Sequence, residues 1–453
     1  MAVDATELTV SRARAEIESG ELSPVELTEA VLERISERNR ELNAYLFVDE
    51  EEARAQARAA ETGGSAAELP LRGIPICVKD IIDVADMPTT AGADHWRRDP
   101  ATDATSVARL RAAGAVIVGK GNTNEFAYGI DGHNPHWGDA RNPHDPERIT
   151  GGSSSGPAAA VAGGLALGGL GTDTGGSLRV PSSLCGVTGF RPTLGNVPLR
   201  GVVPLAWSFD VAGPIARTAE DCSLLLDVLQ GRPVTPPDPS PAGLRIGLLA
   251  ELLSDHSEPH VAEGVERAAQ TLRGLGAQVV EVRPRDLHLA PAVFRTIQLV
   301  EAARAHAKWF NRQRERYAPR VRDLLECGRL LPADAYVAGQ QARRLLVDEI
   351  ADTVREHRLD ALLAPATPVT APRRDAATVT IGEREVPVRA ALLSMTAPIS
   401  LLGGPAAAVP AGTHDGLPFG AQIAARPGAE ATVLRIATAL QGADAPQWFA
   451  TTN

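Results

Sequence analysis

The chain alternates short apolar runs with longer stretches of helical periodicity, and this alternation restricts the fold more than any other feature. One helical segment opens with Ser23-Pro24-Val25-Glu26, the form of a capping box with proline at the first helical position. Strands that alternate with helices predict an α/β fold in which helices cover both faces of a β-sheet. The runs expected to be strands are Ile74–Val78, Ala115–Val118, Leu244–Leu249, Ala277–Val282, Asp360–Ala364, Ala406–Val409 and Phe419–Ala424. The helices expected among them include Ser106–Ala113, His260–Leu275 and Glu430–Leu440.

The domain organisation is less constrained by the sequence. A length of 453 residues suits one large α/β domain or two to three smaller ones. The proline-rich stretch Pro233–Pro241 is the one credible connector, and it either separates two parts of the chain or forms a long surface loop. There is no internal repeat and no low-complexity tail.

Charge and hydropathy exclude several classes of partner. The net charge of −11, without any run of lysine or arginine, argues against a nucleic acid or an anionic membrane surface. No apolar stretch reaches the roughly 18 residues of a membrane span, and the N-terminal segment lacks the apolar core of a signal peptide. We therefore expect a cytoplasmic protein with no membrane partner.

Cysteine and histidine give no sign of a metal site. The cysteines form no CxxC pair, which favours reduced thiols over zinc ligands or disulfides. They are Cys77, Cys185, Cys222 and Cys327. Cys185 is expected in a strand or turn as a core residue. None of the ten histidines stands at a metal-ligand spacing, so we expect no metal and no other cofactor.

Lysine is rare in this chain, occurring only as Lys79, Lys120 and Lys308, whereas arginine fills the other basic positions. A bias towards arginine codons accounts for such a pattern, but arginine stays charged whereas lysine can be tuned into a base. Lys79 and Lys120 each end a strand-like run, so each is either a strand-end cation or a functional base. Lys308 lies in a helical pattern and is expected to be solvated.

Residues 151–164, GGSSSGPAAAVAGG, contain three adjacent serines between glycines. A flexible linker is excluded because a small-residue helix start follows, and a phosphate-binding loop is excluded because no Gly-Lys-Ser/Thr follows. Gly152–Gly156 matches the nucleophile elbow G-x-S-x-G with Ser154 at its centre. The elbow needs a preceding strand, and the preceding ARNPHDPERIT instead predicts a proline-broken loop.

A second stretch, LGTDTGGSLRVPSSLCGVTGFRPT at residues 170–193, repeats Gly-Gly-Ser and places Ser177 24 positions after Ser153. Together with the lysine segment Leu71–Asp80, these stretches resemble the amidase signature family. The similarity continues in WSFDVAGPIARTAED and in the C-terminal GGPAAAVPAG and GLPFGAQIAARP.

The resemblance implies a fold and a division of the chain. The amidase signature fold has a central twisted mixed β-sheet with helices on both faces. It would form one domain over residues 1–453. Residues 65–230 would carry the catalytic residues, and residues 242–453 would complete the sheet and the substrate pocket.

The resemblance also implies a Ser–cis-Ser–Lys triad. Ser177 matches the nucleophile, Ser153 the serine on a cis peptide bond, and Lys79 the base. The backbone amides of Thr174, Gly175, Gly176 and Ser177 match the oxyanion hole. A lysine acts as a base near neutral pH only if its pKa falls by roughly 3 units, which burial among apolar neighbours can provide.

Further roles follow from position and analogy. Ser154, Asp173 and Arg179 are expected to form a buried network that supports the nucleophile. The candidates for the substrate pocket are Phe126, Tyr128, Trp137 and Trp207. One member of the family that acts on a small acid has a carboxylate-binding arginine three residues after the nucleophile. This chain has Val180 there, so the resemblance predicts no carboxylate site at that position.

Three functions are compatible with these residues. The first is an amidase that hydrolyses small aliphatic or aryl-alkyl amides, or carbamate (urethane) and urea-like bonds, through an acyl-enzyme. The second is the glutaminase (A) subunit of a tRNA-dependent amidotransferase. The third is a non-catalytic binding protein on the same fold. The expected partner is a small-molecule amide, and a homodimer is expected from the family.

Overall fold

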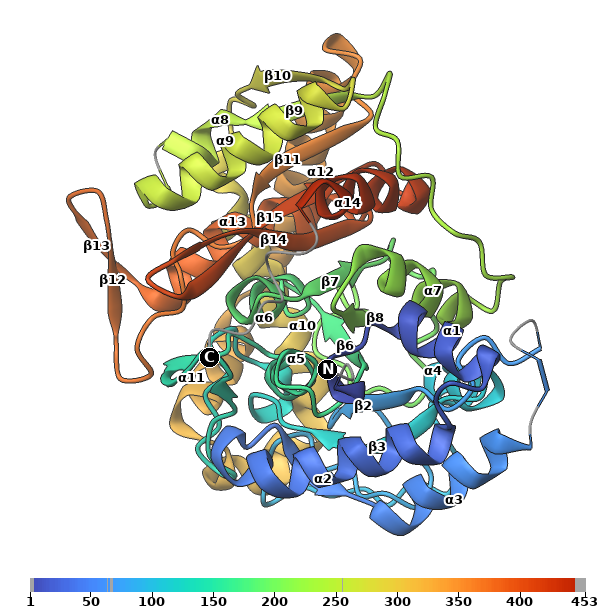
Figure 1. The fold of residues 1–453 in the computed structure, drawn as a ribbon. Coiled ribbons are helices and arrows are strands. Elements are labelled where there is room, and N and C mark those ends of the chain that lie inside the picture. The colour runs from blue at the N-terminus through green and yellow to red at the C-terminus, as the bar shows by residue number, and fades with distance from the viewer. Residues whose placement is uncertain (1–3, 63, 66–67, 255, 445–453) are drawn as a thin grey trace.

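The computed structural model describes residues 4–62, 64–65, 68–254 and 256–444, and a single eleven-stranded β-sheet runs through them (Figure 1). In spatial order its strands are β1 (Tyr45–Val48), β3 (Val116–Gly121), β2 (Pro75–Lys79), β6 (Gly168–Asp173), β8 (Val211–Ala216), β7 (Thr188–Arg191), β14 (Ala406–His414), β15 (Leu417–Ala424), β11 (Ala361–Pro365), β9 (Arg245–Leu249) and β10 (Gln278–Val282). All seven predicted strands are present. Strands from both sides of the Pro233–Pro241 segment share this sheet.

The sheet is mixed, as predicted. Strands β3, β2 and β6 are parallel neighbours, and so are β11, β9 and β10. Antiparallel pairings through β8, β7, β14 and β15 join these two groups, and β1 pairs antiparallel with β3 at one edge. The pairing order therefore places two parallel groups at the ends of one sheet.

Helices cover both faces of the sheet, as two adjacent glycines of β6 show. A Cβ at Gly168 would contact Leu225 of α7 (Ala219–Gln230), whereas one at Gly169 would contact Pro157 of α5 (Ser155–Ala162). Because successive side chains of a strand point to opposite faces, α5 and α7 lie on opposite sides of the sheet. The small residues of β6 allow both helices to approach closely.

The remaining helices complete the two outer layers. They are α1 (Val10–Ser19), α2 (Pro24–Leu42), α3 (Glu50–Glu61), α4 (Thr105–Ala112), α6 (Arg179–Cys185), α8 (Ala250–Ser254), α9 (Pro259–Gly274), α10 (Ala290–Gln313), α11 (Pro319–Leu330), α12 (Ala333–Glu356), α13 (Val388–Leu402) and α14 (Glu430–Asp444). Short 3₁₀ helices are η1 (Ala5–Glu7), η2 (Glu125–Ala127), η3 (Leu287–Leu289) and η4 (Arg314–Arg316). The predicted capping box is present: Glu26 N–H donates to Ser23 Oγ, and Ser23 N–H donates to the Glu26 carboxylate. None of the helices in the described ranges is long and apolar enough to cross a membrane.

Two small two-stranded sheets lie outside the main one. They are β12 (Thr378–Ile381) with β13 (Arg384–Pro387), and β4 (Arg141–Asn142) with β5 (Asp145–Ile149). The prediction that only a proline-broken loop precedes Gly151 is wrong, because β5 ends at Ile149. Its proline lies in a short strand of a separate hairpin, where proline is tolerated.

Candidate active site

The candidate residues meet at the carboxyl ends of two neighbouring parallel strands. Lys79 is the last residue of β2, and Asp173 is the last residue of β6. Ser153 comes from the loop before α5, and Ser177 from the turn between β6 and α6. In α/β sheets, ligands bind beyond the carboxyl ends of the strands, so the topology alone directs attention to this edge.

Three hydroxyl groups surround the amine of Lys79. Its Nζ lies 2.8 Å from Ser153 Oγ, 3.1 Å from Ser154 Oγ and 2.8 Å from Thr172 Oγ1, and the residue is fully buried. Ser154 Oγ donates its own hydrogen to the Thr172 carbonyl over 3.1 Å, so it can only accept from the amine. A neutral amine has two hydrogens and one lone pair. It can therefore donate to Ser154 and Thr172 while it accepts the Ser153 proton.

Burial lowers the pKa of Lys79 to about 7, and the negative charges of Asp173 and Asp210 oppose this shift. None of the described carboxylates pairs with its Nζ. Lys120 is different, because its Nζ lies 2.9 Å from Asp80 Oδ1 and also donates to Thr89. Burial lowers the pKa of Lys120 as well, but the charge of Asp80 and its hydrogen bond oppose that shift. Lys120 therefore has a buried carboxylate partner, whereas the amine of Lys79 lacks one among the described residues and is available as a base at neutral pH.

The loop that carries Ser153 packs closely against the loop that contains Asn124 and Ile130. The peptide bond between Gly152 and Ser153 is cis. Gly152 N–H donates to the Ile130 carbonyl over 2.8 Å, and a Cβ at Gly152 would overlap the Asn124 side-chain oxygen. Only glycine fits there, which explains why glycine precedes this serine.

Ser177 lies next to the same serine loop. Ser154 N–H donates to the Ser177 carbonyl over 3.2 Å, which ties the two serine segments together. Ser154 itself is fully buried between Lys79 and β6, so it cannot serve as the exposed nucleophile of an elbow. Ser177, 5% exposed, borders a small cavity.

The turn after β6 presents fewer amides than the resemblance implied. Gly176 N–H donates to Asp173 Oδ1 over 2.9 Å, so its hydrogen is already used. In the described part of the chain, the amide hydrogens of Thr174, Gly175 and Ser177 have no acceptor. Three amides, rather than four, are available to a bound oxygen atom.

Asp173 organises this turn together with two buried arginines. Burial raises the pKa of its carboxyl group, but the charges of Arg179 and Arg191 outweigh that effect and hold the pKa well below its usual range. Arg179 Nε donates to Asp173 Oδ2 over 3.0 Å, and Arg191 Nη1 donates to Oδ1 over 2.9 Å. Arg191 lies on β7 in the segment GFRPT and was not predicted from the sequence.

Asp210 was also missed by the sequence analysis. Its carboxylate accepts hydrogen bonds from Thr174 Oγ1 over 2.6 Å and from the amides of Leu205 and Ala206 over 2.9 Å each. Burial raises the pKa of Asp210 to about 6, and these hydrogen bonds oppose the shift. Asp210 therefore fixes the side chain of Thr174 and leaves the Thr174 amide free.

The cavity beside Ser177 has a volume of about 10 Å³. Its lining residues are Ala127, Tyr128, Gly129, Ile130, Thr174, Gly175, Ser177, Leu205, Gln298, Arg389 and Leu393. Of the four aromatic residues expected in the pocket, Tyr128 lines it and three lie elsewhere. Phe126 packs in an aromatic cluster with Trp309 and Tyr317, while Trp137 and Trp207 are 44% and 52% exposed. Aromatic residues in a loop sequence do not reveal which of them face the nucleophile.

A second cavity, of about 230 Å³, contains none of the predicted catalytic residues. Its acidic side chains are already paired: Asp131 with Arg320, and Asp139 with His133 over 3.0 Å and Arg374 over 3.4 Å. We assign it no chemistry.

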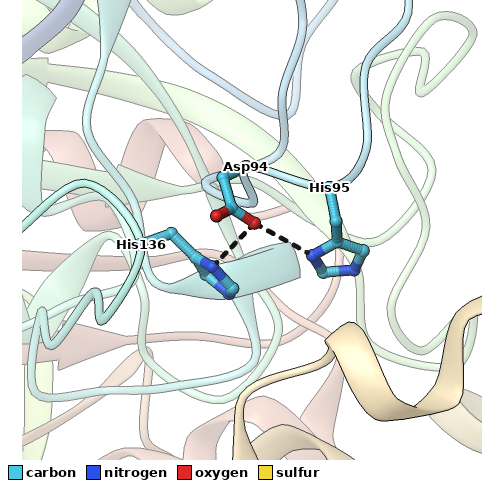
Figure 2. Close-up of side chains that lie close together, drawn as sticks. All are labelled: Asp94, His95 and His136. Atoms are coloured by element: carbon cyan, nitrogen blue, oxygen red, sulfur yellow. Dashed lines mark ion pairs between the residues drawn. The ribbon is translucent and has the colours of Figure 1, made fainter.

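Asp94, His95 and His136 form a cluster that the sequence analysis did not anticipate (Figure 2). Their donor atoms lie within 4.8 Å of one another, and two imidazoles with a carboxylate suit a transition metal. Both ring nitrogens of His136 already have partners, however: Nδ1 lies 3.0 Å from Asp94 and Nε2 lies 3.0 Å from Glu125. The hydrogen bond to Glu125 raises the pKa of His136, so the cluster suits an imidazolium between two carboxylates.

Two other residues singled out in the sequence lie away from the site. Lys308 is exposed on α10, as expected. Cys185 is buried, but it ends helix α6 rather than lying in a strand or turn. Gly186 after it adopts a left-handed conformation that ends the helix, and this signal was present in the sequence.

Comparisons with known proteins show which family the chain is similar to. A family model described as Amidase matches residues 26–434. The chain is similar to the glutamyl-tRNA(Gln) amidotransferase (A) subunit of Roseiflexus castenholzii (strain DSM 13941 / HLO8), at 38% identity over 96% of this chain and 95% of that protein. It is also similar to the AtzE subunit of 1-carboxybiuret hydrolase from Pseudomonas sp. (strain ADP), at 37% identity over 94% and 96%. A crystal structure of an amidase matches with a TM-score of 0.90 at 35% identity, covering 96% of this chain and 100% of that one.

Proposed function

The chain belongs to the amidase signature family, and from that premise we propose that it hydrolyses a small amide through Ser177, Ser153 and Lys79. Its family and relatives support an amidohydrolase, an enzyme that cleaves an amide C–N bond. The proposed substrates are small aliphatic or aryl-alkyl amides, with carbamates and urea-like compounds as further candidates. The mechanism needs no metal or organic cofactor, because the chain's own residues move the protons.

In the first half-reaction, Ser177 Oγ attacks the amide carbon, its proton passes to Ser153, and the Ser153 proton passes to neutral Lys79. The carbonyl oxygen gains a negative charge, and the free amides of Thr174, Gly175 and Ser177 are the donors available to it. When the C–N bond breaks, the relay returns the proton to the leaving nitrogen. The amine departs and leaves an ester on Ser177.

In the second half-reaction, water attacks the ester carbonyl and gives a proton to the same relay. The Ser177 oxygen then leaves and takes up a proton, and the carboxylic acid departs. The relay returns to its starting state, with Lys79 neutral again.

The main support for this proposal is the environment of Lys79. A buried amine without a carboxylate partner among the described residues favours its neutral form, and three hydroxyl neighbours give it a proton donor as well as acceptors. Lys120 provides an internal contrast, because this buried lysine lies 2.9 Å from the Asp80 carboxylate.

The first experiment tests the nucleophile. A fluorophosphonate should label Ser177 in the wild-type protein, as detected by mass spectrometry of the digested chain. Lys79→Ala should lower kcat for amide hydrolysis by about 10³-fold. Lys308→Ala is the matched control, because it removes an exposed lysine on α10 and should leave kcat unchanged. Labelling at a different residue, or a Lys79→Ala enzyme with near-normal turnover, would contradict the proposal.

A second candidate is a glutaminase subunit that works with a partner. Two relatives carry the word subunit in their names, and one of them belongs to a tRNA-dependent amidotransferase. The isolated chain would then release little ammonia from glutamine and would need another polypeptide for full turnover. Comparing the purified chain with a pull-down from its native host, assayed on glutamine and on small amides, separates the two candidates. The expected homodimer is testable by light scattering.

A further inference from the structure

The cavity beside Ser177 contains one charged side chain, Arg389, and no acidic one among its described lining residues. Arg389 lies in the first turn of α13. Its Nη1 is buried and has no hydrogen-bond partner within the described ranges, although part of the side chain reaches the surface. A buried guanidinium nitrogen without an acceptor is unusual, because charged groups in proteins are normally paired.

A second unpaired donor lies against Arg389. The Tyr128 hydroxyl is buried without a partner in the part of the chain that the structure describes, and the Arg389 guanidinium lies 5.6 Å from the centre of the Tyr128 ring. Both residues line the cavity. A hydroxyl and a guanidinium can each donate a hydrogen bond, and in the described part of the chain neither Tyr128 Oη nor Arg389 Nη1 has a partner.

The surrounding charges do not supply that acceptor. Asp131, Arg320 and Arg295 are the other charged groups that act on Arg389. Asp131 is already paired with Arg320 and accepts from Asn124 over 2.9 Å. The remaining two are arginines outside the cavity lining, so the surroundings of Arg389 are positive although the whole chain carries a net charge of −11.

We infer that Arg389, assisted by Tyr128, binds a carboxylate of the substrate. The substrate is then an ω-amide of a short-chain carboxylic acid, with the scissile amide at Ser177 and the acid group at Arg389. This inference rests on the proposed function, since it assigns a substrate class to the same site. Arginine suits the role because its planar fork binds carboxylates in a bidentate manner.

One face of α13 contacts both the cavity wall and the turn that carries Ser177. Arg389, Leu393 and Thr396 are spaced by four and three residues, so they lie on the same face of the helix. Leu393 also lines the cavity, and Thr396 Oγ1 donates to the Gly175 carbonyl beside the free amides. The helix that carries the anion site therefore also fixes the turn that holds Ser177.

The closeness of Arg389 and Ser177, which line the same cavity, limits the length of the substrate. A volume of about 10 Å³ admits roughly one water molecule, so substrate entry must displace side chains at the wall. Because Arg389 and Ser177 line the same small space, only a few bonds can separate the carboxylate from the scissile carbonyl. The family resemblance predicted no carboxylate site at Val180 on α6, whereas the arginine of this cavity comes from α13, far along the chain.

The test uses pairs of substrates of equal size. Succinamate is compared with 4-oxopentanamide, and glutaramate with 5-oxohexanamide, so that an acetyl group replaces the carboxylate. Ammonia release gives kcat and KM for each. The wild-type kcat/KM should favour the acid of at least one pair by about 100-fold or more, because the neutral compound leaves the guanidinium unpaired. Equal values within both pairs, or a preference for the neutral compounds, would overturn the inference.

Substitutions of Arg389 test whether this residue causes the preference for the acid. Arg389→Gln should lower the acid-to-neutral ratio of kcat/KM by about 100-fold, mainly through KM for the acid, and Arg389→Lys should restore part of it. Arg295→Gln is the matched control, because it removes a neighbouring positive charge from outside the cavity lining and should leave the ratio within about threefold of wild type. An equal loss of both activities in a folded Arg389→Gln protein would indicate a structural role and refute the inference. If that variant does not fold, the wild-type ratio decides alone.

Failure of the site and failure of the proposed function give different results. If fluorophosphonate labels Ser177 and the acid has no advantage, only the carboxylate inference is wrong. If Ser177 does not react, the hydrolytic mechanism is wrong, and calorimetry with succinate then tests the anion site by itself. Binding that Arg389→Gln abolishes would support the site, and no binding to the wild-type chain would refute it.

Discussion

Lowering the pH from 8 to 6 should reduce kcat/KM about tenfold, because Lys79 gains the proton that it must lack to act as a base. With a pKa of about 7, roughly nine-tenths of the lysine is neutral at pH 8 and one-tenth at pH 6. Ordinary lysine, with a pKa near 10.4, would instead give a hundredfold fall over the same interval and a plateau only above pH 10.

The magnitude follows from the surroundings of Lys79 Nζ. A pKa of about 7 instead of 10.5 corresponds to about 5 kcal/mol of preference for the neutral amine. Burial is the main cause, and Asp173 and Asp210 oppose it. Asp173 opposes it less than a free carboxylate would, because Arg179 and Arg191 neutralise its charge.

The assay is kcat/KM for ammonia release between pH 5.5 and 9, at constant ionic strength and with a substrate that does not titrate in this range. This quantity reports the pKa values of the free enzyme. Asp210, with a pKa of about 6, adds roughly a further twofold fall by pH 6 to the tenfold fall caused by Lys79. Asp210→Asn should remove this addition and move the Lys79 midpoint to lower pH, because the charge of Asp210 no longer raises the pKa of Lys79. Lys308→Ala should reproduce the wild-type profile.

Two results would refute the reasoning. A kcat/KM that stays constant between pH 6 and 8 would mean that no group with a pKa near 7 controls the reaction. A midpoint above 9 would mean that the buried amine keeps its proton at neutral pH, and another residue would then have to act as the base.

Three further outcomes concern stability and the turn beside the nucleophile. The free energy of unfolding should rise by up to about 1.4 kcal/mol per pH unit between pH 7 and 10, because unfolded lysine binds a proton that native Lys79 lacks. In Lys79→Met, the free energy of unfolding measured by urea denaturation should not show this dependence on pH. Gly176→Ala should lower kcat by about 10²-fold, because Gly176 has a φ of 133° and a Cβ there would overlap Thr396; unchanged kcat would contradict this. Lys120→Met should destabilise the fold by about 3–5 kcal/mol, because it leaves Asp80 buried without its cation; an unchanged urea midpoint would count against that pairing.

The strands that the sequence analysis predicted are those with continuous branched or apolar runs. In the main sheet, β1, β6, β7 and β8 were not predicted. The short apolar run YLFV of β1 was overlooked, whereas β6, β7 and β8 lack a continuous apolar run. β6 is GGLGTD, in which glycines replace the side chains that mark a strand, and β8 contains Pro214. Both are central strands, held by neighbours on either side and by helices on both faces, so tertiary contacts override their weak propensity.

The candidate site also contains some residues that were predicted from the sequence and others that were not. Lys79, Ser153 and Ser177 were predicted because each lies in a contiguous stretch that resembles the amidase signature family. Thr172 and Asp210 were not, because a single threonine or aspartate carries no spacing signal. Their roles depend on which strand ends lie together at one edge of the sheet.

Local pattern alone determined the α/β class and the seven apolar strands, because these depend on neighbours in the sequence. The lysine and the two serines were assigned through the resemblance to the amidase signature family, since local pattern did not distinguish Lys79 from Lys120. The order of the strands, the burial that lowers the pKa of Lys79 and the position of Arg389 beside Ser177 were decided only by the tertiary structure. These properties arise when segments that are far apart in the chain exclude water from a shared space, and no periodicity within one segment can report that exclusion.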